Sequence, residues 1–492
     1  MPTPTLTEEQ LRQAVRLFEK FKNQATCADH LGISRTTFQH RLSEAKRRLG
    51  LEPFQNKFVA AEVKKRSVYL LTAAQDETPV HKDLWENMQA YAEHRGAEIL
   101  VGGFTYQKGL FEDHNVVTGL YSSKLVPFLQ PRVLELGPDI LWYGAANILP
   151  TTANPLAGWQ TQTREKWAVF PHAKIALETV PSMPSRRPKQ LMTSGVVTVA
   201  NYVQRNAGQK AEFHHTLGFT IVEVDRDGDH FCRQVSAEGD GSFQDLETRV
   251  EKGKVTTGHR VKAINPPDLH GEHIPAERAS IIWGLDLEAM TCSEGLIDQL
   301  RPHYQFVDDS FTFSARNHHS RDDPHERAWR LSERNDSVQD NIRAAAQVIA
   351  ATRRPWCRTV HKASNHNLAL DRWLKDTKAA SDAPNAAYWH HLNAVWHERI
   401  REGDRSFQIH AYALQQEVED RLEDVRFLKE GESFLICGQA GAPIECGLHT
   451  HIGARGSRSA ASLRRIVERV NGAHTHEAKI VDALYFTGKA FD

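Results

Sequence analysis

The spacing of apolar residues separates a short helical start from a long remainder in which strands and helices alternate. In residues 7–21 apolar side chains recur every three or four positions, with Thr7 at the N-cap position, which predicts an amphipathic helix. Residues 24–50 repeat this rhythm in two shorter stretches, so we predict two more helices there.

Beyond the basic run KKRS the pattern changes to buried strands with one helix between them. SVYLLTAAQ predicts a strand, DLWENMQAYAEHRG a helix that ends at Gly96, and AEILVGGFTY a second strand. Later segments such as ILWYGA, KIALETV and FTIVEVDRDGDHFCRQV continue as strands to about residue 255. This order predicts an α/β region.

The segment ADHLGISRTTFQHRL in the helical start resembles a helix-turn-helix of the Fis-like kind. Gly32 permits the turn and Ser34 caps the next helix, while the small core would contain Leu31, Ile33, Phe38 and Leu42. The resemblance implies that DNA is contacted by the exposed start of that helix, which carries Arg35, Thr36, Thr37, Gln39 and His40. A three-helix module that docks on another protein is the alternative.

Composition narrows the class of protein. A chain of 492 residues is too long for one core, and a formal net charge of -1 restricts nucleic-acid binding to local patches. The 6 cysteines have no CxxC spacing, which indicates thiols in a reducing compartment. No signal core and no apolar run of about 20 residues is present, so we expect a soluble cytoplasmic protein without a membrane partner.

The chain has 26 histidines, and several of them lie with Asp and Asn in clusters near the ends of predicted strands in the last half of the chain. In an extended segment, residues i and i+2 project to the same side. Two ligand-type side chains separated by one residue could therefore reach the same cation. The clusters, in chain order, are Asp268 with His270, Asp308 with Asp309, Asn365 with His366, His449 with His451, and His474 with His476.

This series resembles the calcineurin-like metallophosphoesterases, whose pattern is Asp-x-His, Gly-Asp, Gly-Asn-His, an isolated His and Gly-His-x-His. Residues 258–492 carry the resemblance, and VKAINPPDLHGEH, ASNHNLALDRWL and IECGLHTHIGARGS are also similar to bacteriophage-encoded DNases of that family. The chain departs from the pattern where Asp308 and Ser364 replace glycines and where Ala473 follows Gly472.

The resemblance implies a layered β-sandwich flanked by helices and a site for two divalent ions, with Mn²⁺ expected and Mg²⁺ or Co²⁺ as substitutes. Two ions about 3.5–4 Å apart can hold a phosphoester and lower the pKa of a bridging water. By the family pattern one ion is held by Asp268, His270 and His476, and the other by Asn365, His449 and His474, with Asp309 between them. His366 would protonate the leaving alkoxide, or stabilise the pentavalent phosphorus, without binding metal.

Several assignments keep an alternative. Asp308 could replace Asp309 as the bridge, and His451 could replace His449 or orient phosphate from behind the ligands. His318 and His319 line the site or form hydrogen bonds outside it. Asp371 is expected on the first turn of a helix as a partner of the ligands or a cap, and Arg455 meets phosphate or belongs to a turn.

The predicted organisation is a helix-turn-helix domain at 1–55, a linker at 56–66, an α/β region at 67–257 and a catalytic domain at 258–492. The function expected is a metal-dependent phosphodiesterase acting on DNA, assisted by the helix-turn-helix and located in the host cytoplasm if phage-encoded. A homo-oligomer is compatible with this sequence. The alternatives are a DNA-bound regulator with a phosphatase-like domain, a phosphomonoesterase, and a histidine-rich domain without activity.

Overall fold

The protein is represented by a computed structural model in which the described part of the chain forms a mixed α/β structure. The described residues are 6–21, 23–48, 51–54, 63, 65–106, 119–183, 185–186, 188–203, 205–266, 268–317, 320, 323–418, 422–437, 443–451, 469–473 and 480. Two compact units are present: Met1–Gly258 with Glu477–Asp482, and His259–His476 with Ala483–Asp492.

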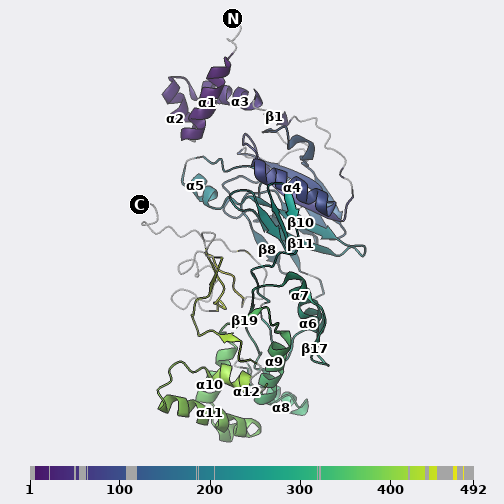
Figure 1. The fold of residues 1–492 in the computed structure, drawn as a ribbon, viewed down its shortest axis with the longest axis vertical. Coiled ribbons are helices and arrows are strands. Elements are labelled where there is room, and N and C mark those ends of the chain that lie inside the picture. The colour runs from purple at the N-terminus through teal and green to yellow at the C-terminus, as the bar shows by residue number, and fades with distance from the viewer. Residues whose placement is uncertain are drawn as a thin grey trace. The chain divides into compact units, whose positions relative to one another are not determined.

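The first helices of unit one are α1 (Glu8–Phe21), α2 (Gln24–Leu31) and α3 (Arg35–Arg48) (Figure 1). Gly32 ends α2 with φ 63°, a left-handed conformation that glycine adopts without strain. Ser34 begins α3 by accepting a hydrogen bond from Thr37 N at 3.0 Å, as predicted for its cap. Phe38 and Leu42 are buried between the helices. The five residues predicted to contact DNA, namely Arg35, Thr36, Thr37, Gln39 and His40, are all exposed.

The central sheet of unit one has the strand order β11-β10-β2-β3. Strands β2 (Val68–Gln75) and β3 (Glu98–Phe104) are parallel and are connected by α4 (Lys82–Arg95), which lies along one face of the sheet (Figure 1). Gly96 ends α4 with φ 60°. Strands β10 (Gly218–Val224) and β11 (His230–Ser236) form an antiparallel hairpin. The strands and helix predicted here are therefore present.

A second sheet of unit one has the order β5-β6-β7-β9-β8. Its strands are β5 (Val133–Gly137), β6 (Ile140–Tyr143), β7 (Trp167–Phe170), β8 (Leu177–Val180) and β9 (Lys189–Thr193). The remaining elements are β1 (Leu51–Phe54) paired with β4 (Gly119–Ser122), η1 (Val126–Phe128), α5 (Asn206–Phe213), β12 (Phe243–Asp245), β13 (Thr248–Glu251) and β14 (Lys254–Thr256).

Unit two is built on a parallel sheet with the order β15-β18-β19-β20. The strands are β15 (Ala263–Ile264), β18 (Tyr304–Val307), β19 (Arg358–His361) and β20 (Arg426–Phe427). The connections contain α6 (Ala276–Trp283), β16 (Leu285–Asp286), β17 (Thr291–Cys292), α7 (Leu296–Leu300), η2 (Ser314–Arg316), α8 (Pro324–Ser332), α9 (Val338–Thr352), α10 (Asn367–Asp376), η3 (Ala379–Ser381), η4 (Ala383–Asn385), α11 (Ala386–Arg401) and α12 (Ile409–Gln416). Parallel strands bring their carboxyl ends to one edge of the sheet, where the polar clusters follow.

An antiparallel pair, β21 (Leu435–Ile436) and β22 (Ile444–Glu445), follows the parallel sheet in the chain. Within the described ranges, unit two thus has one four-stranded sheet and two short pairs, β16–β17 and β21–β22. The α/β class is confirmed at this level, and the two-layer sandwich is a finer expectation that these strands do not test.

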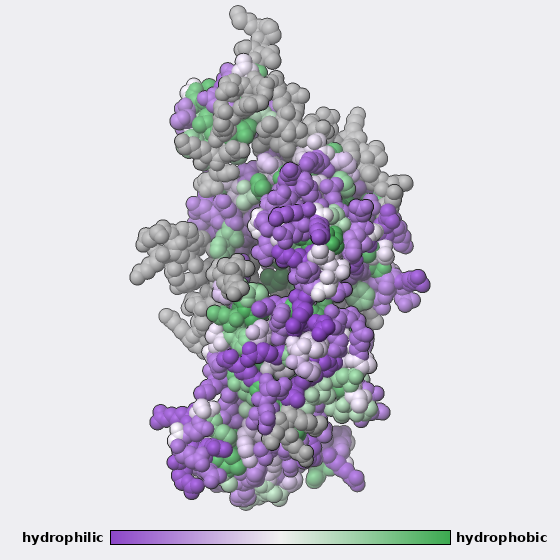
Figure 2. Space-filling model, in the orientation of Figure 1, coloured by the Kyte–Doolittle hydropathy of each residue, from purple (hydrophilic) through white to green (hydrophobic). Residues whose placement is uncertain are grey.

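Hydrophilic residues cover most of the molecular face in Figure 2, and apolar residues form smaller groups between them. Among the helices of the described ranges, none has the length and apolar character required to cross a bilayer.

Candidate metal centre

The polar clusters of unit two come together where its parallel strands end. Asp308 and Asp309 follow β18 directly, and Asn365 and His366 follow β19. The segment after β15 continues alongside them, because Leu269 N donates to Asp308 O at 3.1 Å and His270 N to Asp309 O at 2.7 Å. These backbone bonds hold the Asp-x-His segment against the two aspartates.

The backbone of the Asp-x-His segment is unusual. Asp268 has φ 52°, His270 has φ 44° and Asp309 has φ 40°, so all three lie in the left-handed region that costs free energy for non-glycine residues. The strand alternation predicted for Asp268 and His270 therefore does not apply, and their side chains fall into two neighbouring groups. Non-glycine residues with such conformations often occur at functional sites.

The first group contains His270, Asp309 and His366, which each have a ligand-type atom within 4.8 Å of the others. The rings of His270 and His366 meet edge to face with centroids 5.0 Å apart. Thr312 orients both rings: its Oγ1 is 3.1 Å from His270 Nδ1, and its carbonyl is 3.0 Å from His366 Nδ1. The latter hydrogen bond requires a proton on Nδ1 of His366, so the neutral ring presents its lone pair on Nε2.

The second group contains Asp268, Asp308 and His449, all buried and again within 4.8 Å of one another. Asp308 Oδ1 accepts a hydrogen bond from Asp268 N at 2.7 Å, and its Oδ2 lies 3.3 Å from His449 Nδ1. The other ring nitrogen of His449, Nε2, lies 3.2 Å from Asp309 Oδ2 and 3.0 Å from Asn365 Oδ1. His449 therefore connects the two groups.

Two adjacent carboxylates are buried here, with Asp308 0% and Asp309 1% exposed. Burial would raise the pKa of Asp308, but Lys362 and His449 outweigh it and hold that pKa well below its ordinary value. Burial likewise opposes ionisation of Asp309, and His449 and His366 lower its pKa in spite of it. The pKa of His449 rises to about 9, because the two aspartates outweigh its own burial. Both carboxylates are therefore ionised.

The donor set fits a divalent metal ion. Neither carboxylate oxygen of Asp309 makes a well-aligned hydrogen bond among the described residues, although both oxygens are buried. A buried carboxylate costs folding free energy unless a cation or a hydrogen-bond donor interacts with its oxygens. Carboxylate, imidazole and amide ligands without cysteine suit Mn²⁺ and related ions. Unit two can therefore hold a metal ion at this edge.

The other predicted site residues have different positions. His451 is 7% exposed, with its ring 5.3 Å from that of His449 and its Nε2 3.4 Å from Glu430 Oε2. Asp371 lies on the second turn of α10, not on the first as predicted, and it belongs to neither group. Burial raises the pKa of Asp371 to about 6.

Five predicted residues lie outside the described residues: His318, His319, Arg455, His474 and His476. The described chain just before His474 runs beside the centre, since Ala473 N donates to His449 O at 3.3 Å and Thr450 Oγ1 to Ala473 O at 2.8 Å. Gly472 is required by this close approach, because a Cβ there would be 2.0 Å from Thr450 Cγ2.

Sequence reasoning missed Lys362 and Thr312, which contact predicted site residues, and Ser310, which directly follows Asp309. Lys362 is completely buried, with Nζ 2.6 Å from Asp308 Oδ2. Ser310 pairs with the buried His361 through Oγ and Nε2. The available signal was a lysine between the predicted strand and the predicted ligands, in TVHKASNH, where a buried charge requires a partner.

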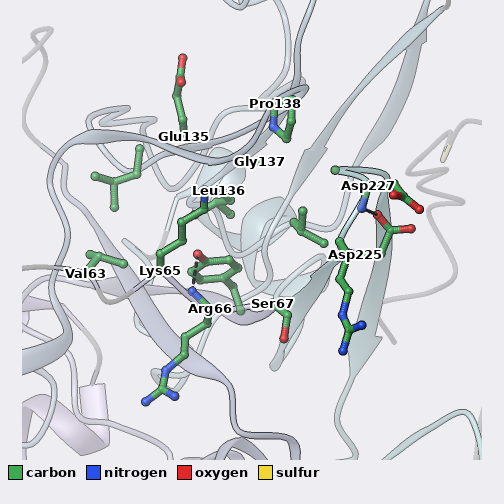
Figure 3. A pocket seen from close by; sticks show the side chains of 15 residues that line it. Val63, Lys65, Arg66, Ser67, Glu135, Leu136, Gly137, Pro138, Asp225 and Asp227 are labelled. Atoms are coloured by element: carbon green, nitrogen blue, oxygen red, sulfur yellow. Dashed lines mark hydrogen bonds between the residues drawn. The ribbon is translucent and has the colours of Figure 1, made fainter.

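A cavity of about 760 Å³ in unit one is separate from this chemistry. Lys65, Arg66 and Ser67 line it from the segment before β2, Glu135 from β5, and Asp225 and Asp227 from the β10–β11 turn (Figure 3). Its three basic side chains are balanced by three acidic ones, so its lining does not favour an anion over a cation.

Comparison with known proteins found one informative relative. No family model and no solved structure matches the chain. Protein A1 of Escherichia phage T5 is 34% identical over 437 residues, which cover 87% of this chain and 76% of the phage protein. The similarity extends over both units, because a match of that length cannot fit within either one. The chain therefore belongs to the family of phage T5 protein A1.

Proposed function

We propose that this protein is a metal-dependent phosphodiesterase of the calcineurin-like type that hydrolyses DNA. The observation that carries the proposal is the convergence of Asp268, His270, Asp309, Asn365 and His449 at one edge of the parallel sheet of unit two. These residues come from four separate segments and correspond in type and order to the family pattern. Membership in a phage protein family is compatible with a DNA substrate.

Two adjacent ion sites would share Asp309. This residue groups with His270 on one side, and its Oδ2 is 3.2 Å from His449 Nε2 on the other. Asn365 contacts the same nitrogen of His449 at 3.0 Å, which supports a common ion for Asn365 and His449. We assign His474 and His476 as the remaining ligands, one to each ion, by the family pattern.

Bound divalent ions would supply positive charge to the phosphoryl oxygens and lower the pKa of a water molecule. To act as the acid, His366 would carry a proton on each nitrogen: Nδ1–H donates to the carbonyl of Thr312 at 3.0 Å, and the Nε2 proton would pass to the leaving alkoxide, which leaves the neutral ring. Its inclusion in the group with His270 and Asp309 also makes it a potential ligand, and metal content of a variant distinguishes these roles.

The helices α1–α3 would add affinity for duplex DNA. At the start of α3, Arg35, Thr36, Thr37, Gln39 and His40 are exposed, whereas Phe38 and Leu42 are buried. Removal of residues 1–55 should weaken duplex binding and flatten its salt dependence, because each phosphate contact contributes about −0.9 to the slope of log affinity against log salt. Hydrolysis of a small chromogenic phosphodiester should stay unchanged, and equal DNA affinity with equal slope would assign these helices to protein docking.

The activity is tested with purified protein on plasmid, linear duplex and single-stranded DNA, with Mn²⁺, with Mg²⁺ and with EDTA. We expect cleavage with Mn²⁺, loss in EDTA and loss in Asp309→Ala, whereas Glu294→Ala, which removes an exposed carboxylate, should cleave normally. Cleavage that persists in excess chelator would exclude the metal mechanism. DNA binding and Mn²⁺ uptake without cleavage would instead favour a DNA-bound regulator.

A further inference from the structure

Lys362 and Asp308 form a buried ion pair next to the candidate metal ligands. Both side chains are 0% exposed, and Lys362 Nζ is 2.6 Å from Asp308 Oδ2. Lys362 N also donates to Val307 O at 2.9 Å, so the lysine backbone is held against the end of β18. A buried ammonium has no lone pair to offer a metal ion, so Lys362 cannot be a ligand.

A second contact holds the ammonium in place. Lys362 Nζ donates to Asn265 Oδ1 at 3.1 Å, and Asn265 Nδ2 donates to Asn471 Oδ1 at 2.8 Å. Asn471 lies two residues before Ala473, which donates its N–H to His449 O. The lysine thus contacts Asp308 and Asn265, and Asn265 in turn contacts the segment that donates to His449 O.

The two nitrogens of His449 face different kinds of partner. Nδ1 lies 3.3 Å from the carboxylate that is paired with Lys362. Nε2 lies 3.2 Å from Asp309 Oδ2 and 3.0 Å from Asn365 Oδ1, two atoms that are themselves assigned as ligands. An ion shared by Asp309 and Asn365 would therefore meet Nε2, while Nδ1 keeps a proton for Asp308.

We infer that Asp308 and Lys362 are a positioning pair that holds His449 with Nδ1 protonated and Nε2 directed at the metal ion, an inference that rests on the proposed metal-dependent function. A histidine ligand is commonly oriented in this way by a carboxylate on its other nitrogen. Lys362 balances the charge of Asp308 and occupies its Oδ2, so Asp309 and not Asp308 is the carboxylate that binds the ion. This explains why two adjacent aspartates occur where the family pattern has one.

The test removes both charges together, because either single change leaves a buried charge without a partner. Asp308→Leu/Lys362→Met should fold and bind Mn²⁺ about 10–100-fold more weakly than the wild type, the usual effect of losing a partner of a ligand. The matched control is Asp298→Leu/Arg354→Met, a bidentate pair with N–O distances of 2.7 and 2.9 Å near the amino end of β19. Its Mn²⁺ affinity, measured from free Mn²⁺ by electron paramagnetic resonance, should equal that of the wild type.

A second readout follows the His449 ring directly. In ¹⁵N-histidine NMR spectra of the full chain with diamagnetic Zn²⁺, His449 should carry its proton on Nδ1 in the wild type and lose this preference in the double variant. Equal Mn²⁺ affinity of the double variant and wild type, or a proton on Nε2 in the Zn²⁺-bound wild type, would overturn the inference.

The outcomes separate this inference from the proposed function. A wild type that binds no Mn²⁺ overturns both, whereas a wild type that binds Mn²⁺ and a double variant that binds it equally well overturn only the role of the pair. If circular dichroism shows that the double variant is unfolded, Asp308→Asn/Lys362→Met also removes both charges but keeps the side-chain shape at residue 308, and it should also bind Mn²⁺ more weakly. Unchanged affinity in Asp308→Asn/Lys362→Met would then reject the inference.

Discussion

Each unit contains a buried aspartate with acidic neighbours, and the partners of these carboxylates differ between the two units. In unit one, Asp245 is 4% exposed and accepts hydrogen bonds from Arg233 Nε at 2.8 Å, Arg233 Nη2 at 2.9 Å and Tyr91 Oη at 2.7 Å. Arg95 and Glu223 extend the group, so two guanidinium groups face two carboxylates. Every oxygen of Asp245 has a donor, and nothing is left for a ligand.

In unit two, Asp309 is buried to the same degree but lacks well-aligned hydrogen bonds among the described residues. His449 is its ion-pair partner, and His270 and His366 lie in the same ligand group. A buried carboxylate is thus no evidence for a site by itself, since Asp245 has a structural role. The informative feature is a buried carboxylate whose neighbours are ligands in place of arginines.

The largest expected difference is the response to metal. Mn²⁺ at about 100 times its dissociation constant should stabilise the wild type by about 2.7 kcal/mol, since it binds only the folded state. Asp309→Ala should lose this Mn²⁺-dependent rise in melting temperature and all DNA cleavage. Asp245→Ala should retain the rise, and calorimetry with and without Mn²⁺ measures both. An equal rise in the melting temperature of Asp309→Ala would show that Asp309 does not bind the Mn²⁺ ion.

The next expected effect separates Mn²⁺ binding from DNA cleavage within unit two. His366→Ala should keep near-normal Mn²⁺ content and slow cleavage by roughly 10²–10⁴-fold, the usual contribution of a general acid. Metal analysis by mass spectrometry and single-turnover kinetics provide the two measurements. A loss of Mn²⁺ as large as that of Asp309→Ala would make His366 a ligand, which the first ligand group also permits.

We expect that disrupting the Asp245 group lowers the stability of the protein without reducing metal binding. Asp245→Ala leaves Arg233 and Arg95 facing only Glu223, and breaking such a buried pair costs about 3–5 kcal/mol. Urea unfolding should show this loss, with Asp227→Ala, an exposed turn residue of the same unit, as the control. Stability equal to that of the wild type would mean that the Asp245 group contributes nothing to unit one.

The smallest expected effect is on acid stability. Burial lowers the pKa of His410 to about 4, and its Nε2 has no hydrogen-bond partner in the described structure. The unfolded state then binds a proton that the folded state does not, so stability should fall as pH decreases from about 6.5 towards 4. At about pH 5 the contribution of His410 to this loss of folding free energy should be about 2 kcal/mol. His410→Gln should reduce it in urea unfolding, whereas the exposed His397→Gln should not.

Much of the local structure followed from patterns within short segments. The caps at Gly32, Ser34 and Gly96 were predicted because a cap depends on residues within one turn of it. The strands β2, β3 and β10 were predicted from their continuous apolar runs, and the clusters of unit two were expected after strands. These features depend on residues that are close together in the chain, so a single sequence is enough to predict them.

Only the tertiary structure decided how the clusters are combined. The left-handed backbone at Asp268 and His270 comes from hydrogen bonds to the chain after β18, about forty residues away in the sequence, and it separates two side chains that strand alternation would place together. The pairing of Lys362 with Asp308, and the choice of which nitrogen of His449 faces Asp309, depend on contacts between distant segments. Residue type and spacing indicate which side chains can bind a cation, but the charge around a buried atom is a sum over everything packed against it.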